Sequence, residues 1–238
     1  MFPSDAQGLS PRWRAAQSAE RNGVLHLSEQ AKAIGKAFNA MIRNLFTTYV
    51  KPEMKVLEVG CGAYGIISEL NCKTKIGIDP LMETYGKYFD LDKRTLYIAA
   101  VGEALPIRDN SIDVCFCNNV LDHTSEPSIV LNQINRALKT RGILILGLYC
   151  YETSLLWWLA LLKEKLPFLR DIYHPHHFTI SQLNALLTLT GFKIISHIDI
   201  TKETYALHAP LYREASVKRA LKCLLGKVYY FLFVCQKE

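Results

Sequence analysis

Residues 56–65 read Val-Leu-Glu-Val-Gly-Cys-Gly-Ala-Tyr-Gly, an apolar run that ends abruptly in a glycine-rich turn. A second apolar run, farther along the chain, closes at Asp79. A buried strand that stops at glycines lets a ligand approach the bare backbone, and an acid that ends the next strand can accept hydrogen bonds from ribose hydroxyls. The two features together predict a site for a nucleoside cofactor.

Short apolar runs alternate with amphipathic segments from Lys55 onward. This alternation predicts an α/β fold, with a doubly wound, Rossmann-like, seven-stranded and mostly parallel sheet and helices on both faces. We expect the last two strands to form an antiparallel pair around a basic helix. The expected strands are residues 55–59, 75–79, 95–100, 112–118, 143–148, 192–200 and 227–236.

The length and composition favour one domain with additions. The chain has 238 residues, and half of them are hydrophobic, which suffices for one substantial core. Residues 1–50 are expected to form an N-terminal arm, irregular or a short lid helix, followed by a packing helix from Ser28 to about Tyr49. Residues 51–150 form the cofactor-binding core and 151–190 an acceptor-side insertion, while 191–238 supply the final strands and the basic helix of the same domain.

The cysteines and the hydropathy pattern bear on the compartment. The chain has seven cysteines, an odd number, scattered mostly in apolar runs where a thiol acts as a small hydrophobic group. Cys115 and Cys117 lack the spacing of a zinc or redox turn, so we expect them in the core. The polar N-terminus and the shortness of the apolar stretch 154–162 predict neither a cleaved signal nor a transmembrane segment. A cytoplasmic location is the expectation.

The net charge of +6 includes a cluster of basic residues near the C-terminus. Such a cluster attracts anions, which could be a phosphorylated acceptor, a lipid head group in peripheral membrane contact, or nucleic acid. A merely solvated helix face is the alternative that we favour. The residues are Arg213, Lys218, Arg219, Lys222 and Lys227.

The glycine spacing alone does not identify the cofactor. Gly60, Gly62 and Gly65 satisfy the dinucleotide pattern G-x-G-x-x-G, and Asp79 fits a nicotinamide enzyme equally well. Glu58, however, lies just before the first glycine, where its charge would repel a pyrophosphate but attract the ammonium and sulfonium groups of S-adenosylmethionine. The alternative role for Glu58 is a cap for loop amides. The charge argument favours S-adenosylmethionine.

Several ordered motifs in residues 54–149 resemble those of the class I S-adenosylmethionine-dependent methyltransferases. They are Val56-Leu57-Glu58-Val59-Gly60-Cys61-Gly62, Gly77-Ile78-Asp79-Pro80 and the segment 102–114, Gly-Glu-Ala-Leu-Pro-Ile-Arg-Asp-Asn-Ser-Ile-Asp-Val. The segment 138–145 is similar to the turn and fifth strand of that family, and Thr190-Gly191-Phe192 to the turn before its sixth strand. The resemblance implies a methyltransferase.

The resemblance also implies which residues bind the cofactor. Gly60, Cys61 and Gly62 would border the methionine portion, with Glu58 beside them. Asp79, followed by Pro80, would bind the ribose hydroxyls. Val101, Gly102 and Glu103 would line the adenine, and Asn118 and Asn119 would face the methyl group. Two positions depart from the family pattern, because Tyr64 replaces a frequent glycine and Val101 an aspartate.

His123, which follows the expected fourth strand, is the candidate for a general base or an acceptor contact. Methyl transfer from a sulfonium is an in-line displacement, and a base is needed only when the acceptor must lose a proton. A histidine here would equally well cap the next helix or line the pocket. The assignment to catalysis is therefore a hypothesis.

The expected insertion contains three clustered histidines, His174, His176 and His177. They could line the acceptor pocket, form a structural turn before a helix capped by Thr179, or bind metal. Magnesium prefers carboxylates and water, and no paired acids accompany these histidines in sequence, so no metal site is predicted. We list them as candidate substrate contacts.

The acceptor class follows only by analogy. The segment 173–179 resembles one in methyltransferases of sugar and secondary-metabolite pathways, which suggests a small-molecule or saccharide (glycan) acceptor. The alternatives are a cofactor-binding regulatory protein without catalysis, a nucleic-acid methyltransferase and a nicotinamide oxidoreductase. Nucleic acid is disfavoured because Asn118-Asn119-Val120-Leu121 stands where an Asn/Asp-Pro-Pro-Tyr type motif would be expected.

Overall fold

The computed structural model describes residues 10–26, 28–151, 157–159, 161–162, 165, 174–208 and 228–238. The basic cluster from Arg213 to Lys227 and most of the segment 152–173 lie outside the described residues. Among the described helices, none combines the length and the apolar character that crossing a membrane requires.

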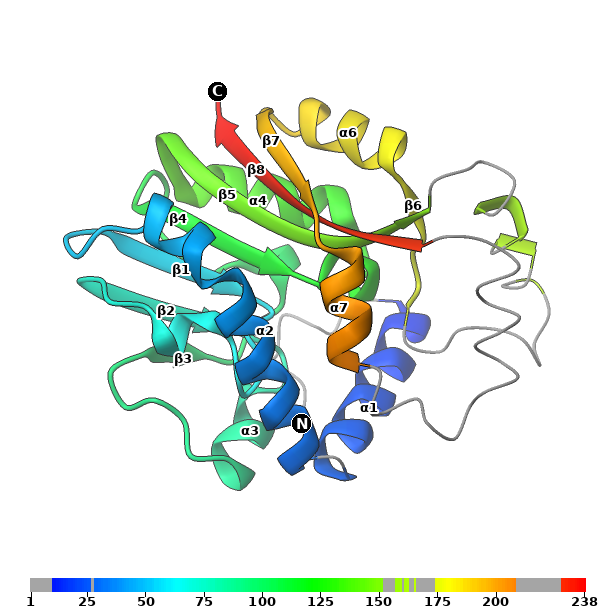
Figure 1. Cartoon of the computed structure of the whole chain (residues 1–238), viewed down its shortest axis with the longest axis horizontal. Helices are drawn as coiled ribbons and strands as arrows, with labels where there is room; N and C mark the ends of the chain where they lie inside the picture. The colour runs from blue at the N-terminus through cyan, green and yellow to red at the C-terminus, as the bar shows by residue number, and fades with distance from the viewer. Residues whose placement is uncertain are drawn as a thin grey trace.

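The centre of the fold is one mixed sheet with the order β3-β2-β1-β4-β5-β8-β7 (Figure 1). Strands β1 to β5 run parallel to one another, whereas β8 is antiparallel to both β5 and β7. The expected doubly wound sheet and its antiparallel final pair are thus confirmed. The strands are β1 (Lys55–Val59), β2 (Thr74–Ile78), β3 (Leu96–Ile98), β4 (Ile112–Asn118), β5 (Leu138–Tyr151), β6 (Phe178–Thr179), β7 (Phe192–Asp199) and β8 (Val228–Lys237).

Within the described residues, the sheet contains the seven expected strands and one short addition. The additional strand is β6, which pairs with the end of β5 through Cys150 and Phe178 and through Tyr151 and Thr179. Two residues are too few to show the alternation of a strand in a sequence, so the sequence does not predict β6. Its pairing with the end of the long β5 identifies it as a strand.

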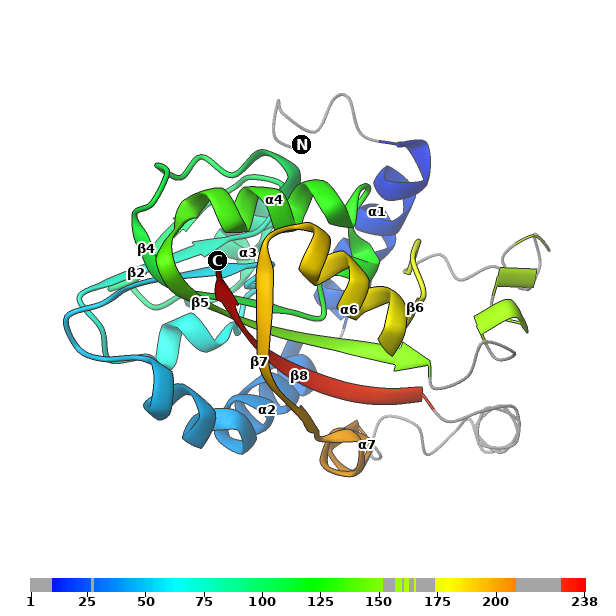
Figure 2. The ribbon, with the colours of Figure 1, turned by 90° about the horizontal axis from the view of Figure 1, so that it is seen from above.

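Helices cover both faces of the sheet, as expected. Viewed from above, α2 and α7 lie on one side of the strands and α4 and α6 on the other, while α1 lies beyond one end of the sheet (Figure 2). The helices are α1 (Pro11–His26), α2 (Ser28–Tyr49), α3 (Met82–Tyr88), α4 (Pro127–Ala137), α6 (Ile180–Leu189) and α7 (Thr201–His208), with short 3-10 turns η2 (Ile66–Glu69), η3 (Gly102–Ala104) and η4 (Leu121–His123).

Strand β4 shows how the period-2 pattern divides the core. Val114 and Phe116 pack under α2, whereas Cys115 and Cys117 face the cluster under α4 and α6. Successive side chains of a strand point to opposite faces, so both faces of this central strand are buried. The two cysteines are fully buried among apolar side chains, which confirms their expected core role.

Helix α6 begins as the sequence predicts. The Thr179 hydroxyl accepts a hydrogen bond from the Gln182 amide, and the Gln182 side chain accepts one from the Thr179 amide. This reciprocal capping box satisfies two amides that a helix start leaves without partners. It fixes the point at which the chain leaves β6, directly after the histidine cluster.

Candidate active site

The glycine turn after β1 is held against the end of β2. The Gly60 amide donates to the Ile78 carbonyl at 2.7 Å, and the Gly62 amide donates to Asp79 Oδ2 at 3.0 Å. Gly60 and Gly62 have φ angles of +72° and +53°, a region that L side chains disfavour. A Cβ on Gly60 would lie 2.2 Å from Val120 Cγ2. The backbone can follow this path only without a side chain at Gly60.

Asp79 is buried at the end of β2 with its carboxylate fixed by two amides. Its Oδ1 accepts from the Leu81 amide at 2.8 Å, and its Oδ2 accepts from Gly62. Burial raises the pKa of Asp79 to about 6, and the Glu20 carboxylate of α1 adds to the rise. The side chain is therefore oriented in advance and ready to accept from a ligand donor.

A cavity of about 310 Å³ opens beside this turn. Helix α1 contributes Trp13, Gln17 and Glu20 to its wall, while the rest comes from the ends of β1 and β2, the segment 100–103 and the segment after β4. Three lining residues are acids, namely Glu20, Asp79 and Glu103, and none of the described lining residues is lysine or arginine. The predicted contacts Gly60, Gly62, Asp79, Pro80, Val101, Gly102, Glu103 and Asn119 all line this cavity, together with His123 and His174.

The segment expected to contact adenine is fixed by α4 and its preceding turn. Glu103 Oε1 accepts from the Ser125 amide at 2.7 Å and from the Glu126 amide at 3.3 Å. A Cβ on Gly102 would lie 3.0 Å from Val130 Cγ1, so helix α4 approaches this backbone closely. Val101, where the family often has an acid, is buried. This part of the cavity wall therefore consists of the apolar Val101, the backbone at Gly102 and the Glu103 carboxylate, which already accepts two hydrogen bonds.

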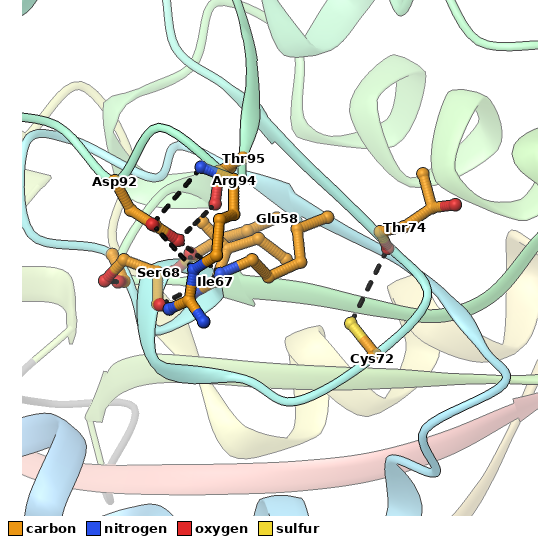
Figure 3. Close-up of polar contacts among 10 residues, drawn as sticks. Glu58, Ile67, Ser68, Cys72, Thr74, Asp92, Arg94 and Thr95 are labelled. Atoms are coloured by element: carbon orange, nitrogen blue, oxygen red, sulfur yellow. Dashed lines mark hydrogen bonds and ion pairs between the residues drawn. The ribbon is translucent and has the colours of Figure 1, made fainter.

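Glu58 is bonded to its own loop. Its carboxylate accepts from the Ile66 amide at 3.2 Å and the Ile67 amide at 2.9 Å, and Figure 3 shows the side chain directed toward Ile67. Burial raises the pKa of Glu58 to about 8, although both amides oppose the rise. These two hydrogen bonds are the ones expected if Glu58 caps the amides of the loop. A direct contact of Glu58 with the cofactor stays a prediction.

A second cavity, of about 290 Å³, adjoins the first at Gly60 and Asn119. Its wall is mainly apolar and aromatic, from α2, β4, β5 and β8, and it includes Phe38, Phe46 and Tyr149. The predicted residues Glu58, Cys61 and Asn118 line this cavity and not the acid-lined one. Two spaces of different chemistry therefore meet at the glycine turn.

Asn118 and Asn119 end β4 with different roles. Asn118 Oδ1 accepts from the Tyr230 hydroxyl of β8 at 2.7 Å. Asn119 has a φ of +55°, and its Nδ2 lies 3.4 Å from His123 Nε2. Asn119 Oδ1 is buried without a hydrogen-bond partner. Asn119 thus faces the cavities with an acceptor oxygen still available.

The three histidines of the insertion do not share one surface. His174 lines the acid-lined cavity. The His176 ring lies 3.2 Å from the Ser125 carbonyl, and the His177 ring lies 3.4 Å from the Tyr151 hydroxyl. Neither His176 nor His177 lines either described cavity. Their role as acceptor contacts stays a prediction, and the structure shows structural partners for both.

Comparison with known proteins finds a family model that matches the part of the chain that forms this site. A model described as "Methyltransferase domain" matches residues 57–146, which contain the glycine turn, Asp79 and β4. Residues 57–146 thus match the methyltransferase-domain family, the kind of family that the sequence motifs resemble. S-adenosylmethionine is the cofactor of this family. The cavity beside the glycine turn suits a cationic ligand of this kind, since its charged lining is acidic and the glycine turn leaves the backbone open.

The curated relatives of this chain match it only in part. An uncharacterized methyltransferase of Mycobacteroides abscessus is 40% identical over 56 residues, 24% of this chain and 22% of that protein. An uncharacterized protein of Methanocaldococcus jannaschii is 27% identical over 145 residues, 60% of this chain and 67% of that protein. The match thus spans about a fifth of the first relative's length.

Solved structures share the fold of this chain at low identity. A geranyl diphosphate methyltransferase in complex with S-adenosylmethionine has a TM-score of 0.63 at 13% identity, covering 84% of this chain and 85% of that one. The [4+2]-cyclase SpnF has a TM-score of 0.58 at 18% identity, covering 83% and 80%. At such identities the likeness shows the fold alone.

The sequence argument missed two polar residues of the cavity wall, Gln17 and Glu20, and it missed Asp122, which lies beside His123 and His174. Gln17 and Glu20 follow Trp13 at helical spacings of four and seven, so the face was readable once the arm was taken as a helix. Asp122 directly precedes His123, and its nearness to His174 comes only from the fold. The arm is helical in α1, and Trp13, which is 2% exposed, lines the cavity; its role as a lid stays a prediction.

Proposed function

We propose that this protein transfers a methyl group from S-adenosylmethionine to a small-molecule acceptor. The observation that carries the proposal is the cavity lined by Glu20, Asp79 and Glu103 with no lysine or arginine among its described lining residues. A pyrophosphate would be repelled there, whereas an ammonium and a sulfonium are attracted. The charge of the site therefore favours this cofactor over a dinucleotide.

The proposed placement of the cofactor follows the wall of the acid-lined cavity. The ribose hydroxyls donate to Asp79, and the adenine lies along Val101, Gly102 and Glu103. The methionine portion crosses the bare backbone at Gly60 and Gly62, where the two cavities meet. The methyl group then points to Asn119, which leaves the acceptor the space around Asn119, His123 and His174.

The chain's own residues supply alignment and exclusion of water. Methyl transfer needs the acceptor lone pair in line with the carbon–sulfur bond, and such positioning can supply much of the rate enhancement. Trp13 and its helix α1 cover the cavity from outside, which keeps water from the sulfonium carbon. If the acceptor is a hydroxyl group, it must also lose its proton, and a group near His123 would accept that proton.

The apolar cavity supports an acceptor with an apolar or aromatic body. Phe38, Phe46 and Tyr149 offer it hydrophobic area, and Asn118 and Asn119 offer polar atoms at its inner end. One of the similar structures is a C-methyltransferase in complex with geranyl diphosphate, a small molecule. A saccharide remains the alternative, since sugars also stack on aromatic rings.

Two measurements test the proposal. Calorimetry should show S-adenosylmethionine binding that Asp79→Ala weakens, while Asp113→Asn, which lies outside the cavity, leaves it unchanged. Incubation with methyl-labelled cofactor and a fractionated lysate should yield a labelled product that partitions into organic solvent. A product that stays in water would indicate the saccharide, and absence of cofactor binding would refute the proposal.

A second candidate function keeps the cofactor and loses the transfer. The likeness to a [4+2]-cyclase shows that this fold is also found in an enzyme named for a different reaction. A regulatory protein or such an enzyme would bind S-adenosylmethionine and give no labelled product from any fraction.

We also propose a reducing, cytoplasmic setting, because every described cysteine is a free thiol.

A further inference from the structure

Three potential metal ligands lie together beside the acid-lined cavity: the adjacent residues Asp122 and His123, and His174 from a distant part of the chain. Asp122 Oδ1 lies 3.9 Å from His123 Nε2, and Asp122 Oδ2 lies 4.0 Å from His174 Nε2. The two imidazole rings have their centroids 4.5 Å apart. One ligand atom from each of the three residues lies within 4.8 Å of the other two.

The carboxylate of this cluster has an acceptor oxygen without a donor. The Asp122 side chain is 7% exposed, and its Oδ1 has no hydrogen-bond partner. Asn119 Oδ1, on the neighbouring turn, is likewise buried and without a partner. A buried carboxylate oxygen without a donor or cation is costly, so the cluster calls for a positive ligand. His123 Nε2 lies 3.9 Å from Asp122 Oδ1 and His174 Nε2 lies 4.0 Å from Asp122 Oδ2, and both distances are too long for hydrogen bonds.

The backbone keeps the three ligands together. The His176 amide donates to the Asp122 carbonyl at 3.2 Å, and the Arg12 guanidinium of α1 lies 3.5 Å from the His174 carbonyl. The His176 ring is tied to the Ser125 carbonyl. These hydrogen bonds connect the segment 174–176 to the turn that contains Asp122 and His123. They place the His174 ring beside the Asp122 carboxylate.

We propose that Asp122, His123 and His174 bind a divalent first-row transition-metal ion. Two imidazoles and one carboxylate are a donor set of zinc, iron and related ions, whereas magnesium prefers oxygen ligands alone. Ligand atoms around such an ion lie about 3 Å apart, so binding draws the side chains inward by about 1 Å. His123 and His174 line the cavity, which leaves the remaining coordination positions open to it. The expectation of no metal rested on the absence of acids beside the histidines in sequence, and the fold supplies Asp122.

The consequence for the acceptor rests on the proposed function. An ion at this place binds an acceptor hydroxyl and lowers its pKa, so that the oxygen–hydrogen bond breaks and the proton leaves to solvent. The oxygen then forms its bond to the methyl carbon, and the carbon–sulfur bond breaks with its electrons on sulfur. This arrangement favours an oxygen nucleophile and gives His123 a role as ligand instead of base.

The test is direct metal binding to the full chain after removal of metal with a chelator. Co²⁺ titrated into this protein should give the visible absorption of a protein-bound ion at one equivalent, and calorimetry with Zn²⁺ should give the same stoichiometry. Asp122→Asn, His123→Gln and His174→Gln should each weaken binding by about tenfold or more, the loss seen even for outer-shell partners. His197→Ala, an exposed histidine on β7, is the matched control and should bind as the native protein does.

The outcomes separate this proposal from the proposed function. Absence of stoichiometric Co²⁺ and Zn²⁺ binding, or binding that all three variants retain, overturns the metal site whatever the methylation assay shows. Because His174 is 36% exposed, His174→Gln leaves the core intact and its result stands if the buried Asp122 variant fails to fold. Metal binding that is lost in His174→Gln and kept in His197→Ala supports the site even if no methylated product is found.

Discussion

At the scale of single residues, Asp79 has a carboxylate whose charge depends on pH within the physiological range. Burial raises the pKa of Asp79 to about 6, so the carboxyl is ionised at pH 7.5 and takes up a proton as the pH falls through 6. Ribose hydroxyls donate well to the ionised form, and a proton on the carboxyl removes one of its acceptor sites. At pH 5 only about a tenth of the molecules carry the ionised group. Cofactor affinity should therefore fall about tenfold between pH 7.5 and pH 5.

Calorimetry with S-adenosylhomocysteine at pH 5, 6 and 7.5 measures this dependence. Asp79→Asn should bind more weakly at every pH and show little change between them, because it has no proton to gain. Asp113→Asn should keep the native profile, since Asp113 pairs with Lys139 outside the cavity. A native affinity that stays constant from pH 5 to pH 7.5 would contradict the assignment of Asp79.

At the scale of elements, the glycine turn after β1 offers a comparison between two glycines of positive φ. A Cβ at Gly60 would lie 2.2 Å from Val120, while a Cβ at Gly62 would have nothing within 4 Å. Gly62→Ala should cost only the backbone strain, about 1–2 kcal/mol. Gly60→Ala adds the collision with Val120, the N-cap residue of η4, and should cost more.

Urea unfolding of the two glycine variants measures the difference in the free energy of unfolding. The double variant Gly60→Ala/Val120→Ala should recover part of the loss, because it removes the methyl groups that collide and leaves only the strain. Equal costs for Gly60→Ala and Gly62→Ala would show that the turn relaxes away from Val120. Cofactor binding should fall with Gly60→Ala in particular, because the added methyl fills the gap between the two cavities.

Helix α1 can be tested through its tryptophan. Trp13 is 2% exposed on the cavity wall, whereas Trp158 is 62% exposed. A nucleoside that enters the cavity changes the surroundings of the Trp13 indole. Titration with S-adenosylhomocysteine should change the intrinsic fluorescence of the native protein and of Trp158→Phe. The change should be largely lost in Trp13→Phe, and its persistence there would show that α1 does not close over the cofactor.

The elements differ in how far a sequence could predict them. The strands β1, β2 and β4 have apolar runs bounded by turns, and their bounds were predicted to within a residue. Strand β5 begins five residues before the apolar run at Ile143, because Leu138 continues the pairing across a turn of polar residues. The two residues of β6 form a strand only because β5 extends beside them, and no local pattern encodes that pairing.

At the scale of the whole molecule, the site is assembled from distant parts of the chain, and this limits prediction more than any single element does. The sequence predicts that Gly60, Asp79 and Asn118 lie together, because the ends of parallel strands meet at one edge of a sheet. Glu20 comes from α1, and His174 from the segment before β6. Their approach to the same cavity depends on tertiary packing, which spacing along the chain does not record.

Strand β8 connects this assembly to the stability of the molecule. It lies between β5 and β7, and its side chains fill both faces of the sheet. Phe233 is fully buried, so Phe233→Ala should lower the free energy of unfolding by about 3–5 kcal/mol through lost burial and the cavity left behind. Leu189→Ala, at a leucine that is 84% exposed, is the matched control and should change it by less than about 0.5 kcal/mol.

Urea unfolding of these two variants, with and without S-adenosylhomocysteine, tests whether β8 and the site form one cooperative unit. The Tyr230 hydroxyl of β8 donates to Asn118 beside the cavities, so the strand and the site share a contact. If they unfold together, a saturating ligand should raise the stability of native, Phe233→Ala and Leu189→Ala proteins by the same increment, set by its concentration and affinity. A smaller increment in Phe233→Ala would mean that the packing of β8 also sets the shape of the site.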